Sequence, residues 1–142
     1  MLLEESFTAR GHPNIRATHE KTVEVTKETH LTICGDCIAA IKAEKGLADL
    51  SIEMKNAARR PESIISLTIR VGLKVFTTTG RGDSELTWGH PTDMVARMSG
   101  YTCPRTLMVH ADKAIIHMAR SLVQQLKDPQ AIVKITVSIE TP

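Results

Sequence analysis

Aromatic side chains are scarce in this sequence, which has one Trp, one Tyr and two Phe among 142 residues. A hydrophobic core must therefore be built mostly from Ile, Leu, Val, Met and Ala. The scarcity also argues against a nucleic-acid platform on which several bases stack, because such platforms are usually aromatic. A chain of this length suits one domain, 1–142, and can bury an adequate core without disulfide bonds or metal.

Long hydrophobic runs are absent as well, since no stretch approaches the roughly 20 apolar residues that a membrane span needs. The N-terminus carries Glu4 and Glu5 and has no basic region ahead of an apolar run, so it does not resemble a secretory signal. The three cysteines are an odd number, which disfavours a disulfide framework and favours reduced thiols. We therefore expect a cytoplasmic protein that does not enter a membrane.

Charge of one sign is not in large excess, because the net charge is +2 and the basic residues are spread along the chain. A dedicated nucleic-acid binder usually has a clustered basic face, so the charge alone does not indicate one. The phosphate-binding loop, the dinucleotide fingerprint, the zinc-protease helix motif and the nucleophile elbow are all absent. No common catalytic signature therefore assigns a reaction.

What the sequence does contain is an internal repeat. A shift of 68 positions aligns Ala43 with Ala111, Lys45 with Lys113, Pro61 with Pro129, Ile64 with Ile132 and Thr68 with Thr136. The N-terminal parts align at 71 positions, which matches Thr8 with Thr79, Arg10 with Arg81, Gly11 with Gly82 and His19 with His90. The change from 71 to 68 positions implies a difference of length in a loop within 27–36, where such changes are tolerated. We predict two repeats, about 1–71 and 72–142.

The hydrophobic pattern of each repeat predicts about four strands and one helix. Apolar and polar residues alternate in 65–71 and 133–139, as in half-buried strands, and helical spacing runs through 115–126. Strands are expected at 2–10, 20–27, 36–43, 64–71, 73–81, 92–98, 105–110 and 131–140, with a hairpin at Gly72, and helices at 47–60 and 112–127. The prediction is an α+β fold in which a closed or nearly closed, barrel-like sheet has pseudo-twofold symmetry.

Histidines are the first candidates for chemistry, because imidazole changes charge near neutral pH. His19 and His90 occupy equivalent places in the repeats, where they could share a divalent metal or act as acid and base. They could equally lie at opposite ends of the sheet as satisfied polar residues. Asp93 follows His90 closely and could orient it, while His12 lies in a strand-end turn.

Basic residues near strand ends are candidates for holding an anion. Arg10 and Arg81 each precede a glycine, and Arg105 precedes a predicted strand. Lys45 and Lys113 lie where a strand gives way to a helix, a place where an anionic ligand can bind. The alternative is that these arginines are solvated and that the neighbouring acidic residues cap the helices.

Cys34-Gly35-Asp36-Cys37 has the spacing of a redox pair or of half a zinc site, with Cys103 and His30 as further ligands. The segment that follows has the pattern of a strand rather than a helix, which favours two small thiols beside a turn. Asp36 in that turn is a candidate acid or base, although turn aspartates often bond their own backbone.

The motifs Phe7-Thr8-Ala9-Arg10-Gly11-His12-Pro13-Asn14, Gly35-Asp36-Cys37-Ile38, His90-Pro91-Thr92-Asp93-Met94-Val95 and Cys103-Pro104-Arg105-Thr106 occur in that order. In this respect the chain resembles a family of small archaeal proteins that is known as a domain of unknown function. The resemblance covers nearly the whole chain. It implies an archaeal cytoplasmic protein, but it implies no reaction and supplies no catalytic residues.

Three functional hypotheses stay open at this level. In the first, a cleft between the repeats binds or converts an anionic metabolite with phosphate or carboxylate groups, with or without a metal. In the second, the chain is an RNA-binding module, which the strand-rich duplicated fold would permit. In the third, it is an assembly subunit without catalysis, and a homo-oligomer fits any of the three.

Overall fold

A computed structural model describes all residues, 1–142, and has the α+β fold that the sequence predicts. It contains eight strands, two α-helices and two short 3-10 turns. In chain order they are β1 (Leu2–Arg10), β2 (Thr22–Thr26), β3 (Ile38–Ala40), η1 (Leu47–Asp49), α1 (Ile52–Ala58), β4 (Ile64–Val71), β5 (Lys74–Arg81), β6 (Asp93–Arg97), β7 (Thr106–Met108), η2 (Ile115–His117), α2 (Arg120–Leu126) and β8 (Ile132–Glu140).

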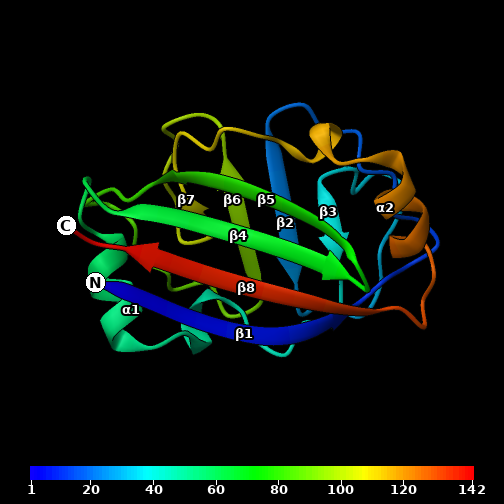
Figure 1. The fold of residues 1–142 in the computed structure, drawn as a ribbon, viewed down its shortest axis with the longest axis horizontal. Coiled ribbons are helices and arrows are strands. Elements are labelled where there is room, and N and C mark those ends of the chain that lie inside the picture. Colours follow the sequence, from blue (N-terminus) through cyan, green and yellow to red (C-terminus); the bar gives the residue numbers. More distant parts are fainter.

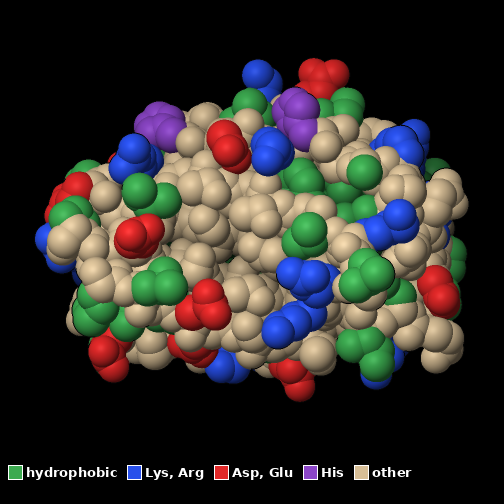
Figure 2. Space-filling view, in the orientation of Figure 1, with side chains coloured by type: hydrophobic (Ala, Val, Ile, Leu, Met, Phe, Trp, Pro, Cys, Tyr) green, Lys and Arg blue, Asp and Glu red, His purple; other side chains and the backbone are tan.

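The first sheet consists of four long antiparallel strands in the order β1-β8-β4-β5. Its strands alternate between buried apolar and exposed polar positions, since one face packs on the core and the other meets solvent. The predicted hairpin at Gly72 is confirmed and joins β4 to β5. The middle of the exposed face is uncharged, because serine and threonine hydroxyls occupy the central positions of these strands (Figure 2).

The second sheet is shorter and has the order β3-β2-β6-β7. The central pair, β2 and β6, is antiparallel, whereas β3 and β7 each run parallel to their neighbour. Its strands cross those of the first sheet steeply, and α1 and α2 lie at opposite ends of the molecule (Figure 1). Between the sheets lies one cluster of 37 buried hydrophobic residues, which includes the indole of Trp88.

The predicted closed or nearly closed barrel is wrong, because the strands form two separate four-stranded sheets. The sheets approach each other at two corners, but each corner has only a single bridge, Arg10 with Ile41 and Arg81 with Val109. The next residues in the second sheet, Lys42 and His110, have positive φ angles of 52° and 54°. This left-handed backbone ends the strands and prevents continuous pairing around the fold.

The helices are shorter than predicted, since each expected helix is divided into a 3-10 turn and a seven-residue α-helix. The backbone is extended at Leu50 and at Met118, which interrupts the helical hydrogen bonds. After the first 3-10 turn, Ser51 restarts the helix, because its hydroxyl accepts a hydrogen bond from the Met54 amide. No helix is long and apolar enough to cross a membrane.

Candidate functional site

The outer face of the second sheet carries polar side chains in a position where solvent is partly excluded. The antiparallel register of β2 and β6 sets three pairs side by side on this face: Thr22 with Arg97, Glu24 with Val95, and Thr26 with Asp93. The loops before β3 and β7 cover this face, so Glu24, Thr26 and Asp93 are buried although they point away from the core.

Glu24 and Asp93 share one arginine. Arg105 Nη2 donates to Glu24 Oε1 at 3.1 Å and lies 2.8 Å from Asp93 Oδ2. The two acidic side chains are only 8% and 10% exposed, whereas that of Arg105 is 44% exposed. Buried carboxylates need such a partner, because desolvation of an unpaired charge costs several kcal/mol. Arg105 therefore holds two acidic groups together at the centre of the face.

Hydroxyl groups complete the surroundings of Asp93. Thr26 Oγ1 donates to Asp93 Oδ1 at 2.6 Å, and Thr92 Oγ1 donates to the same oxygen at 2.9 Å. With Arg105 on the other oxygen, both oxygens of Asp93 have partners. Thr26, Thr92 and Arg105 thus fix the position of the Asp93 side chain.

Glu24 has fewer hydrogen-bond partners than Asp93, which leaves one of its carboxylate oxygens free. Burial, together with the neighbouring charge of Asp93, raises the pKa of Glu24 in spite of Arg105. Its Oε1 also lies 3.7 Å from the Cys37 thiol, whose pKa is raised to about 11 by burial and by Glu24 itself. Glu24 Oε2 has no hydrogen bond from the protein. A carboxyl group whose pKa lies nearer neutrality than usual is suited to proton transfer.

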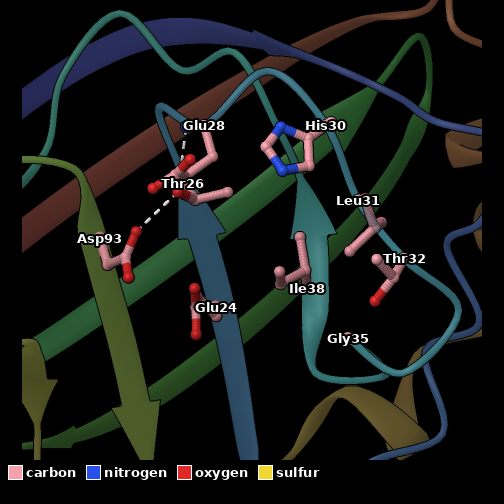
Figure 3. Close-up of a pocket in the computed structure, with 9 residues that line it drawn as sticks. All are labelled: Glu24, Thr26, Glu28, His30, Leu31, Thr32, Gly35, Ile38 and Asp93. Carbon is pink, nitrogen blue, oxygen red and sulfur yellow. Dashed lines mark hydrogen bonds between the residues drawn. The ribbon is translucent and has the colours of Figure 1, made fainter.

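Two pockets of opposite charge meet at Glu24. The acidic pocket, of about 230 Å³, lies between β2, β3, β6 and the loop that carries Glu28 and His30 (Figure 3). The side chains of Thr26 and Asp93 are hydrogen-bonded along its wall, as Figure 3 shows. The basic pocket, of about 290 Å³, lies on the other side of Glu24. It is lined by His19, Thr22, Glu24, Cys37, Val95, Arg97 and Arg105.

The basic pocket continues into a wider outer hollow of about 640 Å³, with which it shares His19, Thr22 and Arg97. The hollow adds Lys21, Met98, Ser99 and Tyr101 to the lining. These volumes lie in the range of small-molecule sites. The combined surface carries three unpaired basic side chains, because neither His19, Lys21 nor Arg97 forms an ion pair with a carboxylate.

Arg97 is fixed by a hydroxyl group, a cysteine and an aromatic ring rather than by a carboxylate. Its Nε donates to Thr106 Oγ1 at 2.8 Å, its Nη2 donates to Cys103 Sγ at 3.4 Å, and its guanidinium lies 5.0 Å from the centre of the Tyr101 ring. A guanidinium has five N–H donors, and these contacts use two of them. Arg97 therefore presents free donors and an unneutralised charge to the pocket.

Cys103 lies beside Arg97 in a setting that favours its thiolate. Burial alone would raise its pKa, but hydrogen bonds from the Arg105 amide, the Thr106 hydroxyl and Arg97 outweigh burial and lower it. The pKa of Cys103 is thus lowered and that of Cys37 raised relative to an ordinary thiol. All three cysteines are unpaired. The alternative of a zinc site at Cys34 and Cys37 gains no support, since no three His, Cys, Asp or Glu side chains gather as a metal centre requires.

The two predicted histidines lie apart. His19 precedes β2 and His90 precedes β6, and because these strands are antiparallel, the residues stand at opposite ends of the pair. Each ring accepts hydrogen bonds from following backbone amides at Nδ1, those of Lys21 and Thr22 for His19 and those of Thr92 and Asp93 for His90. Only His19 lines a pocket, and because its Nδ1 accepts hydrogen bonds, its Nε2 carries a proton and is a donor.

Most of the other predicted residues serve the first sheet. Lys45 forms an ion pair with Glu5 at 2.7 Å, and Lys113 Nζ donates to the Thr77 carbonyl at 3.3 Å. Arg10 and Arg81 are exposed at strand ends, where Arg10 reaches the Gln130 carbonyl. The acidic neighbours do not cap helices: Glu44 accepts from the Thr8 amide and Asp112 from the Thr79 amide.

Two predicted acid–base residues contact other loop residues and line none of the pockets. Asp36 accepts a long hydrogen bond from the Thr18 hydroxyl at 3.4 Å, and its carbonyl accepts from the amides of Thr18 and His19. His12 accepts from the Asn14 amide and lines none of the pockets. Of the acid–base and anion-binding residues that the sequence suggested, the structure therefore brings together Asp93, Arg105 and, at the edge, His19.

Sequence reasoning missed Glu24, Thr26 and Arg97. Thr22-Val23-Glu24-Val25-Thr26 alternates, so Glu24 has the pattern of a solvent-facing strand position. Arg97 has the same kind of position in β6. The one available signal was the predicted insertion in the loop after β2, because this loop forms the outer wall of the acidic pocket.

Comparison with known proteins assigns this chain to a family. Residues 7–140 match the family described as "Domain of unknown function (DUF371)". A protein of the archaeon Methanocaldococcus jannaschii, named "Uncharacterized protein MJ0206", is 42% identical over 131 residues, which span 92% of this chain and 96% of that protein. Both matches agree with the archaeal resemblance of the sequence motifs, and this chain belongs to the DUF371 family.

Proposed function

We propose that the protein binds a small anionic metabolite, carrying phosphate or carboxylate groups, in the basic pocket on the outer face of the second sheet. The observation that carries this proposal is the unpaired Arg97, which is fixed by Thr106 and Cys103 and faces the pocket without an acidic partner. A guanidinium in this state matches the planar, bidentate geometry of phosphate and carboxylate oxygens. His19 and Lys21 add two further donors to the same surface.

Glu24 gives this site a group that can exchange a proton with a bound molecule. It forms part of the pocket lining, its pKa is raised by burial and by Asp93, and one of its oxygens is free. If the protein is an enzyme, Glu24 is its acid–base residue, and Arg105 and Asp93 position it. Because β2 belongs to the first predicted repeat and β6 to the second, the site lies between the two halves of the chain.

Calorimetric titration with ribose 5-phosphate at low ionic strength tests the binding proposal. Wild-type protein should bind the sugar phosphate, and Arg97→Gln should weaken binding by about tenfold or more, since hydrogen bonds to charged groups contribute about 1.5–3 kcal/mol. The matched control is Arg70→Gln, which removes an exposed arginine from the first sheet. Equal affinity of the wild type and the Arg97 variant would overturn the proposal.

The proposal does not use a metal at His19 and His90, since the two rings stand at opposite ends of the β2–β6 pair. A shared divalent metal stays a prediction, which elemental analysis of chelator-free protein and of the His19→Ala variant would test. Cytoplasmic location, homo-oligomerisation, a role as a non-catalytic assembly subunit and binding of RNA also stay predictions. For RNA, Phe7, Phe76 and Trp88 are buried, so only Tyr101 is open to stacking.

We also propose that the chain is a single domain that arose by duplication of a unit of about 70 residues, as the two sequence offsets suggest. Reciprocal contacts support this: the His12 amide donates to the Leu126 carbonyl, and the Asp83 amide donates to the Ala58 carbonyl. Positive φ angles recur at the same offsets, 55° at Ala17 and 50° at Trp88.

The strand registers fit a twofold axis that passes through both sheets. Thr68 lies opposite Thr136 in the first sheet, and these residues are 68 positions apart. Glu24 lies opposite Val95 in the second sheet, and these residues are 71 positions apart. Each pair thus joins a position to its own counterpart, as an axis between two copies requires.

A further inference from the structure

The lining of the outer hollow narrows the class of ligand that the proposed site would take. Tyr101 is the only aromatic residue with a largely exposed side chain, since it is 61% exposed while the other three aromatic residues are 0–7% exposed. In a chain so poor in aromatic residues, its single open ring lies at the widest pocket and beside the unpaired Arg97.

The backbone of Tyr101 is anchored by two hydrogen bonds. The Tyr101 amide donates to Ser99 Oγ at 3.3 Å, and its carbonyl accepts from Thr106 Oγ1 at 3.3 Å. Arg97 covers one side of the ring at 5.0 Å from its centre. Thr106 bonds both the Tyr101 carbonyl and Arg97, so the Tyr101 backbone and the Arg97 guanidinium are anchored by the same residue.

The hollow offers two kinds of surface, the flat ring of Tyr101 and a cluster of basic donors. Different parts of one ligand would occupy them. The open side of an aromatic ring stacks on a heterocyclic base, and every base has a face that suits this contact. Arg97, His19 and Lys21 suit a phosphate group. The volumes of the hollow and of the basic pocket, about 640 and 290 Å³, suit a ligand larger than inorganic phosphate.

We propose that the ligand of this site is a mononucleotide, whose base stacks on Tyr101 and whose phosphate binds Arg97, His19 and Lys21. This inference rests on the proposed anion-binding function and adds the base to it. A single nucleotide rather than a longer strand fits the surface, because one ring is available and the rest of the aromatic residues are buried.

Calorimetric titration with adenosine 5′-monophosphate, compared with ribose 5-phosphate, separates the base from the phosphate. Wild-type protein should bind the nucleotide at least about tenfold more tightly, in line with the usual contribution of one stacked base. Tyr101→Ala should abolish this difference between the two ligands, whereas Tyr101→Phe, which keeps a ring beside Arg97, should keep the preference for the nucleotide. Because Tyr101 is exposed, both variants should retain the thermal midpoint of the wild type.

Three results would overturn the inference. Equal affinity for the nucleotide and for ribose 5-phosphate would show that the base makes no contact that contributes to binding, and it would leave the anion-binding function intact. A pentanucleotide that binds much more tightly than the mononucleotide points to a single-strand surface instead. If neither phosphate compound binds, the inference and the proposed function both fail.

Discussion

Glu24 lies directly opposite Val95 across the β2–β6 pair, and Val95 is also the residue 71 positions further along the chain. One position of a matched pair is therefore a buried carboxylate and the other is apolar. The two neighbours of Glu24 also differ from each other, since Glu24 contacts the thiol of Cys37 and the guanidinium of Arg105. If the chain is a duplication, its two halves have diverged at the point where they meet.

Removal of Arg105 should destabilise the protein strongly. Arg105→Met leaves Glu24 and Asp93 buried without a cation, and we expect the free energy of unfolding at pH 7 to fall by about 3 kcal/mol. Urea denaturation followed by circular dichroism measures the change. The control is Arg60→Met, which breaks an exposed ion pair with Glu62 and should cost under about 1 kcal/mol. Similar losses in both variants would show that Arg105 does not hold the two acids.

Glu24→Gln should change how stability depends on pH. The pKa of Glu24 is higher in the folded protein than in the unfolded chain. As the pH rises from the unfolded-state pKa through the folded-state pKa, ionisation of Glu24 therefore favours unfolding. Glutamine cannot ionise and still accepts a hydrogen bond from Arg105. The variant should therefore gain stability relative to wild type between pH 4 and pH 7, as measured by denaturation at both values. A constant difference between the proteins would contradict the raised pKa.

The cysteines should differ in their reaction with iodoacetamide, because the thiolate is the reactive form. At pH 7.5 Cys103 should be alkylated much faster than Cys37, whose pKa is raised to about 11 by burial and by Glu24. Peptide mass spectrometry of timed samples measures each rate, and the exposed Cys34 provides an internal reference. Arg97→Gln should slow the reaction of Cys103 alone. Faster alkylation of Cys37 than of Cys103 would refute the assignment.

Alanine at either of two glycines should destabilise the protein through the same kind of clash. A Cβ at Gly11 would lie 2.3 Å from the Leu126 carbonyl oxygen, and one at Gly82 would lie 2.2 Å from that of Arg60. Each substitution should cost about 1–3 kcal/mol in thermal or urea unfolding. Gly89→Ala is the control, since the nearest atom to its Cβ would be 3.7 Å away. A neutral effect at only one of Gly11 and Gly82 would argue against matched contacts in the two halves.

The long strands could be predicted because their alternation is strict. Residues 64–71 were expected as a strand and form β4 with the same bounds, since Ile65, Leu67 and Ile69 are buried at every second position. The helix expected at 112–127 could not be delimited in this way. Its first part has helical spacing, but the extended backbone at Met118 divides it, and tertiary contacts such as the bond from the Ile116 amide to the His19 carbonyl fix the turn.

The site was only partly visible in the sequence for a related reason. Asp93 and Arg105 stood out as charged residues near strand ends, whereas Glu24 looked like an ordinary exposed position. Its burial depends on loops that fold over the outer face, and alternation within a strand carries no information about such a cover. His19 and His90 stood out in the sequence but do not form one site. Their places in the two predicted repeats correspond, yet the antiparallel pairing of β2 and β6 puts them at opposite ends of the pair.

The most direct test of the proposed anion site is a nuclear magnetic resonance titration of ¹⁵N-labelled protein with ribose 5-phosphate at constant ionic strength. The expected result is saturable shifts of the amide signals of His19, Thr22 and Arg97, with the strands of the first sheet unchanged. Shifts confined to the first sheet, or no saturable shift at all, would contradict an anion site on the outer face of the second sheet.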